Sequence, residues 1–154
     1  MAFIIESMRE RDVEPAARLR LAAFFEGANR TLEQDMAGLR SLLAAGDDCE
    51  AALVARVGEK LAGCALLVRN ELDAAHDLTP WLAGLVVSRE FRRRGIGAAL
   101  VNAAEMRAAG AGIRTLYLYT WDAREFYASL GWRPVEAFEE AGGPVMLMSR
   151  SLQL

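Results

Sequence analysis

The chain has 154 residues, of which 53% are hydrophobic and 25% charged, so we expect residues 1–154 to form one globular domain with a substantial core. A net charge of −3 argues against a nucleic-acid partner, and no apolar run approaches the roughly eighteen residues of a membrane span. The sequence begins without a signal-peptide pattern, and its two cysteines, Cys49 and Cys64, lack CxxC spacing and histidine neighbours, which is typical of a reducing, cytoplasmic location.

The first third of the chain predicts a short strand over residues 3–5 and two helices. Asp12 is placed to cap the first helix. Apolar residues then follow at helical spacing: Val13, Ala17, Leu21, Phe24 and Phe25. Residues 31–34 form a capping box that begins the second helix.

The remaining two thirds alternate strand and helix patterns. Strands are predicted over 50–57, 61–69, 81–88, 114–119, 132–138 and 145–151, with helices from 96 onward and through 126. This order predicts an α/β (α+β) domain, in which a mixed central β-sheet of about six to seven strands, with one parallel crossover, is flanked by about four helices. The strand at 81–88 is apolar on consecutive positions, as a strand buried on both faces should be.

Residues 92–97, which read Arg-Arg-Arg-Gly-Ile-Gly, are the most informative segment. They lie between an apolar strand pattern and a helical one. Glycines at such a turn let backbone N–H groups approach a ligand closely. A helix N-terminus adds unpaired donors and a partial positive charge, which suits phosphate. Because arginines crowd this segment in a chain that is net negative, the expected ligand carries several phosphates.

Spacing excludes two familiar phosphate motifs. A dinucleotide fingerprint needs a small residue at position 100, where Leu100 stands, and a P-loop needs a Gly-Lys pair, whereas the only lysine is Lys60. The pattern Arg-x-x-Gly-x-Gly after a buried strand resembles the coenzyme A pyrophosphate loop of the GNAT superfamily of N-acetyltransferases.

A second block, about thirty residues later, supports the same resemblance. After a strand, the superfamily often shows Asn-x-x-Ala-x-x-Phe/Leu-Tyr-x-x-x-Gly-Phe. Four residues match in register: Ala123, Phe126, Tyr127 and Gly131. Thr120 stands where Asn is frequent, and Trp132 replaces the Phe. The resemblance runs from about residue 2 to residue 151.

The resemblance implies acetyl-CoA as the cofactor and no metal. The strands at 81–88 and 114–119 would run parallel and splay apart, with pantetheine in the gap. It also implies a set of cofactor-binding residues: Leu85, Val86, Val87, Arg92, Arg93, Arg94, Gly95, Ile96, Gly97, Ala98, Thr120, Ala123 and Phe126. Tyr127 would be the catalytic acid that protonates the leaving thiolate, because a phenol titrates near pH 10 and remains a donor at neutral pH.

The general base is less visible, because the strand at 81–88 has no carboxylate where some relatives place a Glu. Acting directly or through water, the candidates just upstream are Glu71, Asp73, His76 and Asp77. His76 is the only histidine and has a suitable pKa range, although a lone histidine in a polar loop is more often a solvated residue. Glu139 and Glu140 could attract a cationic amine or belong to a solvated surface. Trp81 and Trp121 could shape an acceptor pocket, although core packing is the favoured interpretation.

The expected function is therefore transfer of an acetyl group from acetyl-CoA to a primary amine of a small molecule, by direct attack in a ternary complex of a bacterial enzyme. Two alternatives stay open: a catalytically weak acyl-CoA-binding regulatory module, and a protein acetyltransferase that modifies lysine or an N-terminus. Homodimer formation through the C-terminal strands, which is common among relatives, also stays open. No nucleic acid or membrane is expected as a partner.

Overall fold

The computed structural model describes residues 2–25, 28–71, 77–140 and 143–152. In chain order the elements are β1 (Ile4–Ser7), α1 (Glu10–Phe24), α2 (Leu32–Ala44), β2 (Ala51–Val57), β3 (Lys60–Val68), β4 (Trp81–Val87), a 3-10 turn (Arg89–Phe91), α3 (Ile96–Gly110), β5 (Thr115–Thr120), α4 (Arg124–Ser129), β6 (Arg133–Glu140) and β7 (Gly143–Ser151). Among the described residues, no helix is both long enough and apolar enough to cross a membrane.

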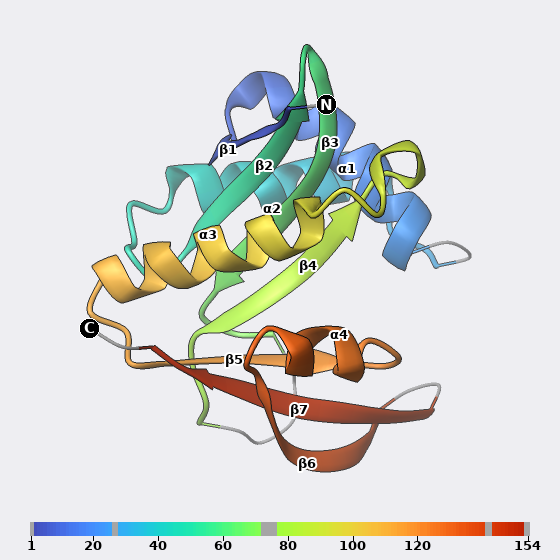
Figure 1. Cartoon of the computed structure of the whole chain (residues 1–154). Coiled ribbons are helices and arrows are strands. Elements are labelled where there is room, and N and C mark those ends of the chain that lie inside the picture. Colours follow the sequence, from blue (N-terminus) through green and yellow to red (C-terminus); the bar gives the residue numbers. More distant parts are fainter. Residues whose placement is uncertain (1, 26–27, 72–76, 141–142, 153–154) are drawn as a thin grey trace.

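One seven-stranded sheet, with strand order β1-β2-β3-β4-β5-β7-β6, organises the fold. All neighbours are antiparallel except β4 and β5, which run parallel. Helices α3 and α4 cover one face of this sheet, and α1 and α2 cover the other (Figure 1). The α/β (α+β) fold class predicted from the sequence, with a mixed sheet and four helices, is confirmed.

The parallel pair separates almost at once. Trp81 of β4 lies opposite Tyr117 of β5, and this is the one paired position between the two strands. Beyond it, β4 and β5 diverge, as Figure 1 shows. Trp81 itself is 1% exposed and packs on Tyr117, with ring centroids 5.9 Å apart, so its predicted place in the core is confirmed. The sheet is therefore open at its centre.

Strand β4 carries a bulge beside this opening. The side chains of Trp81, Ala83 and Val86 all belong to the core under α1 and α2, so alternation slips by one residue between Ala83 and Val86. The register with β3 shifts at the same place, and Gly84 has φ +61°. An extra residue inserted in this way bends a strand and redirects its side chains. The bulge at Gly84 and Leu85 thus lies at the edge of the gap.

Of the two helix caps predicted from the sequence, one is wrong and one is confirmed. The prediction that Asp12 caps α1 is wrong: the helix begins at Glu10, and Asp12, one turn in, accepts the backbone N–H of Arg9 at 2.9 Å. Thr31 caps α2 as predicted, in a reciprocal capping box with Gln34. The prediction failed at Asp12 because this carboxylate works from the third helical position, where it also binds Arg56.

Candidate active site

A pocket of about 660 Å³ lies between β4 and β5, where the two strands have separated. Its walls include Leu82 to Leu85 of β4 and Leu118 to Thr120 of β5. Tyr127 reaches it from α4, on one face of the sheet, while Arg20 and Phe24 reach it from α1, on the other. The pocket therefore connects the two faces through the sheet.

On the α3 face, the loop joins β4 to a helix as predicted, but only one of the two predicted turn glycines, Gly95, lies in the turn, because Gly97 already belongs to α3. Arg93 and Gly95 both adopt positive φ, +65° and +83°, and α3 begins at Ile96. The first N–H groups of a helix have no acceptor within it, so those of Ile96, Gly97 and Ala98 are directed out of the helix end. The loop thus presents backbone donors, with an exposed basic side chain at Arg93.

Two arginines of this loop are held by local contacts. The Nε of Arg92 donates to the backbone carbonyl of Val87 at 3.0 Å, which fixes its stem at the end of β4. The guanidinium of Arg94 lies 5.7 Å from the ring centroid of Phe91. Both stems are thereby oriented in the loop that precedes α3.

Gly97, in the first turn of α3, faces the end of β4 and the helix α4. A Cβ at this position would lie 3.5 Å from Cζ of Phe126 and 3.8 Å from Cγ2 of Val87. Val87 and Leu85 both pack toward the α3 face, whereas the side chain of Val86 is buried under α1 and α2. Of the three predicted β4 residues, the structure therefore brings Leu85 and Val87 toward the loop, and only the backbone of Val86 is available there.

Tyr127 is placed in the pocket by the start of α4. The hydroxyl of Thr120 accepts the N–H of Ala123 at 3.0 Å and closes the turn before the helix. The Tyr127 ring then packs between Phe126 and Trp132, at centroid distances of 5.1 and 6.1 Å. Thr120, Ala123 and Phe126, predicted as cofactor contacts, are thus gathered around Tyr127.

The Tyr127 hydroxyl is suited to donate a proton. The side chain lines the pocket, and the part of the chain that the structure describes makes no hydrogen bond to its oxygen. Burial, and secondarily the negative charge of Asp122, raise the pKa of Tyr127 to about 12. Tyr127 therefore stays protonated across neutral and mildly alkaline pH.

Trp132 fastens α4 to α3 and β7. Its Nε1 donates to Glu105 of α3 at 3.1 Å, and Arg150 of β7 lies 3.5 Å from the same carboxylate. Arg150 also donates to the backbone carbonyl of Gly131 at 3.1 Å. The aromatic residue that replaces the common Phe thus adds a polar anchor behind Tyr127.

On the α1 face, Glu71 is the predicted base candidate that the structure places in the pocket. Its carboxylate accepts the Tyr119 hydroxyl at 3.3 Å. Burial raises the pKa of Glu71 above its usual value, although the Tyr119 hydrogen bond and the charge of Arg20 act in the opposite direction. Asp77 is exposed and does not line the pocket, while Asp73 and His76 lie outside the described residues.

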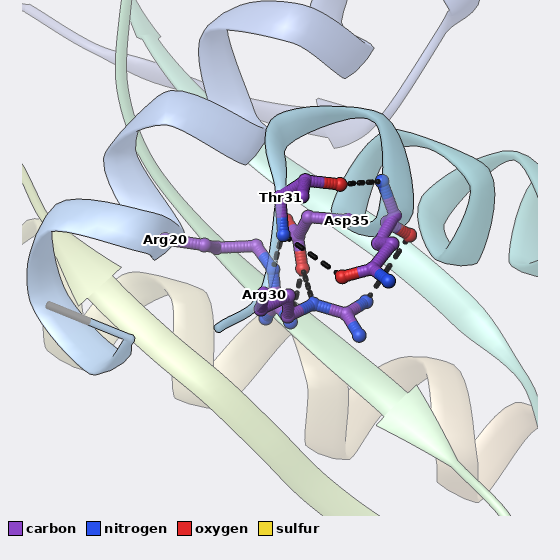
Figure 2. A network of polar contacts seen from close by, with 5 residues as sticks. Arg20, Arg30, Thr31 and Asp35 are labelled. Atoms are coloured by element: carbon purple, nitrogen blue, oxygen red, sulfur yellow. Dashed lines mark hydrogen bonds and ion pairs between the residues drawn. The ribbon is translucent and has the colours of Figure 1, made fainter. Parts of the chain in front are cut away.

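Several pocket residues were missed or misread from the sequence. Phe24 and Phe25 were read as a helical core stripe, and Trp121 as core, but all three line the pocket, and Trp121 is 48% exposed. Arg20 was not singled out. The available signal was its spacing, because Arg20 follows Val13 and Ala17 on the stripe of α1 that faces the sheet, where a charge needs a partner. That partner is Asp35 of α2 (Figure 2).

Comparison with known proteins now identifies the family. Residues 13–132 match the model of the acetyltransferase (GNAT) family. No curated protein sequence matches the chain. Among solved structures, an aminoglycoside 6′-N-acetyltransferase complexed with coenzyme A is 19% identical, with a TM-score of 0.79 over 98% of each chain.

Two further structures share the fold. An N-acetyltransferase from Staphylococcus aureus Mu50 is 15% identical, with a TM-score of 0.81 over 99% of this chain and 100% of the other. The yncA acetyltransferase from Salmonella typhimurium, solved with its cofactor acetyl-CoA, is 14% identical, with a TM-score of 0.80 over 99% of this chain and 95% of the other. The cofactor expected from the sequence is thus the one bound in structures of this fold. The chain belongs to the GNAT acetyltransferase family.

Proposed function

We propose that the protein is an N-acetyltransferase that transfers the acetyl group of acetyl-CoA to a primary amine of a small molecule. One observation carries this proposal: the pocket between β4 and β5 is lined by residues from both faces of the sheet. A proton donor, Tyr127, enters it from the α4 side, and a carboxylate, Glu71, lies on the α1 side. Two substrates can therefore meet inside the sheet.

The α3 side suits coenzyme A. Backbone donors at the start of α3 and the arginines of residues 92–94 fit a pyrophosphate. Because Gly97 has no side chain between Val87 and Phe126, a ligand can approach the backbone at the start of α3 closely. Because β4 and β5 do not pair beyond Trp81, the backbone of β4 on the gap side can hydrogen-bond an extended pantetheine arm. The coenzymes of two structural neighbours support this assignment.

The chemistry divides between the two faces. When bound, acetyl-CoA supplies the acetyl group as a thioester. Glu71 takes one proton from the ammonium form of the acceptor, so that the neutral nitrogen can form the new C–N bond as the C–S bond breaks. Tyr127 gives its proton to the thiolate sulfur and recovers one from the nitrogen, so protons balance.

Neither cysteine is suited to carry the acetyl group as a covalent intermediate, which fits direct transfer. Cys64 is buried in the core, and burial raises the pKa of its thiol to about 12. A buried thiol of this kind is inert as a nucleophile. Cys49 does not line the pocket. A ternary complex is therefore the proposed route, without an acetylated cysteine.

Thiol release from acetyl-CoA tests the proposal. The enzyme is mixed with a panel of small primary amines, and acetyl-CoA binding is measured in parallel by calorimetry. We expect amine-dependent thiol release with at least one small amine. Acetyl-CoA binding without release would instead indicate a regulatory acyl-CoA-binding module, and release only with peptides would indicate a protein acetyltransferase.

A further inference from the structure

Arg20 contributes an unusual group to the pocket. Its side chain is 11% exposed and extends from α1 to Asp35 of α2. Nε donates to one oxygen of Asp35 at 3.0 Å, and Nη2 donates to the other at 3.2 Å. The third nitrogen, Nη1, occupies the space in which a side chain at Gly84 would begin. Arg20 therefore lies against the β4 bulge at the wall of the pocket.

This arginine belongs to a cluster with excess positive charge. Figure 2 shows Arg20 and Arg30 converging on Asp35, whose side chain is fully buried. The Nε of Arg30 lies 2.9 Å from Asp35, and its Nη2 donates to the backbone carbonyl of Gln34. One carboxylate thus serves two guanidinium groups, which leaves a net charge of about +1 on the three side chains. Of the two cations, only Arg20 lines the pocket.

The third guanidinium nitrogen of Arg20 has donors available to a ligand in the pocket. Within the described part of the chain, Nη1 makes no hydrogen bond, although it carries two N–H donors. An anionic oxygen placed there would accept a charge-assisted hydrogen bond from Nη1, so a ligand that supplies one gains affinity. A carboxylate matches both the geometry and the charge of a guanidinium edge.

The other end of the same face has the opposite charge. Glu71 lines the pocket beside Tyr119 and is near enough to Arg20 to feel its charge. Around these two groups, the wall is mainly aromatic: Phe24, Phe25, Tyr119 and Trp121. An ammonium can face Glu71, a carboxylate can face Arg20, and an apolar group can pack on the rings.

We propose that the acceptor amine carries a carboxylate, as in an α-amino acid with an apolar or aromatic side chain, and that Arg20 Nη1 binds this carboxylate beside Gly84. The proposal rests on the acetyltransferase function above and names its substrate class. A polycation such as an aminoglycoside would bring an ammonium next to Arg20, where like charges repel. A peptide N-terminus lacks a carboxylate on the reacting residue and would leave Nη1 unpaired.

Binding to the CoA-saturated enzyme separates these classes without turnover. Calorimetric titrations compare phenylalanine with phenethylamine and leucine with isopentylamine, pairs that differ only in the carboxylate. We expect the wild type to bind each amino acid about 10- to 100-fold more tightly than its decarboxylated partner, as for a charge-assisted hydrogen bond. Kanamycin should bind more weakly than phenylalanine.

Two lysine variants assign the preference to one residue. Arg20→Lys keeps a cation for Asp35 but removes the guanidinium edge at Gly84, so the preference for the carboxylate should fall about 10-fold or more. Arg30→Lys is the matched control: it alters the same cluster outside the pocket and should keep the preference. Thermal unfolding checks that both variants fold. If Arg20→Lys does not fold, the proposal is decided by the binding of amino acids and decarboxylated amines to the wild type.

The proposal is overturned if the decarboxylated amines or kanamycin bind the wild type as tightly as the amino acids. It is also overturned if folded Arg20→Lys weakens amines and amino acids equally, since Arg20 would then act without regard to the carboxylate. Acetyl transfer to phenethylamine in preference to phenylalanine would contradict the proposed substrate class but would support the acetyltransferase function. No thiol release with any amine would overturn the function itself, and the substrate class with it.

Discussion

At the scale of single residues, the pocket contains one group suited to donate a proton and another suited to accept one. Tyr127 has a pKa of about 12 and keeps its proton, while Glu71 is a carboxylate whose burial raises its pKa. Environments that separate two titrating groups in this way are typical of acid–base pairs. The two residues reach the pocket from opposite faces of the sheet, so each can serve a different substrate.

Substitution of Tyr127 by Phe tests the acid. The ring keeps its packing against Phe126 and Trp132, but the donor is lost. We expect kcat to fall about 10²-fold, with acetyl-CoA affinity nearly unchanged. Steady-state kinetics and calorimetry measure the two quantities. Tyr117→Phe, which removes a hydroxyl from a tyrosine that does not line the pocket, should keep kcat. Near-wild-type turnover in Tyr127→Phe would mean that the thiolate leaves without this proton.

The pH dependence tests the base. Glu71 must be ionised to accept a proton, so kcat/KM should fall as pH drops through its pKa, which burial raises above the usual value. In Glu71→Gln, we expect kcat/KM to fall about 10²-fold at neutral pH and this acidic limb to disappear. Tyr119→Phe should move the limb to higher pH, because the hydrogen bond that it removes favours the charged carboxylate. An unchanged limb in Glu71→Gln would assign the base to another group.

At the scale of elements, the local signals were readable in the sequence and the long-range ones were not. The loop at 92–97 and the motif from Thr120 to Trp132 are contiguous, so their glycine and aromatic spacing predicts a strand–turn–helix and the start of α4. The bulge at Gly84 was hidden, because a strand that is apolar on consecutive positions has no alternation to break. The sequence also gave no sign that β7 lies between β5 and β6.

The pocket residues on the proposed acceptor side could not be predicted, for a related reason. Glu71 accepts a hydrogen bond from Tyr119, which is 48 residues away in the chain, and Arg20 of α1 lies against Gly84 of β4. No spacing rule connects such positions, so Glu71 was one of four candidates and Arg20 was passed over. Trp121 was assigned to the core because aromatic residues usually pack there, yet it lies on the pocket wall.

The junction of β4, α3 and α4 provides a test of the cofactor path. In Gly97→Val, the new Cβ would contact Phe126 and Val87, and its methyl groups would fill the space between them. We expect acetyl-CoA affinity, measured by calorimetry, to fall about 10-fold or more, because the added side chain would occupy space that the ligand needs. Gly110→Ala, at the other end of α3 with open space around it, is the control and should keep the affinity. Equal affinity in Gly97→Val would mean that the cofactor runs elsewhere.

At the scale of the whole molecule, the two faces of the sheet carry the groups that we assign to the two substrates. Helices α3 and α4 cover the face with the loop and Tyr127, while α1 and α2 cover the face with Arg20 and Glu71 (Figure 1). The divergence of β4 and β5 is what lets the two faces communicate, because paired strands would close the sheet. The central claim is that coenzyme A enters this gap from the α3 face.

A crystal structure of the protein with bound coenzyme A tests that claim most directly. We predict the pyrophosphate at the backbone N–H groups of residues 95–98, the pantetheine arm along β4 between Val87 and Gly84, and the sulfur within hydrogen-bond reach of the Tyr127 hydroxyl. Coenzyme A bound outside the gap between β4 and β5, or with its sulfur on the α1 face away from Tyr127, would contradict the account.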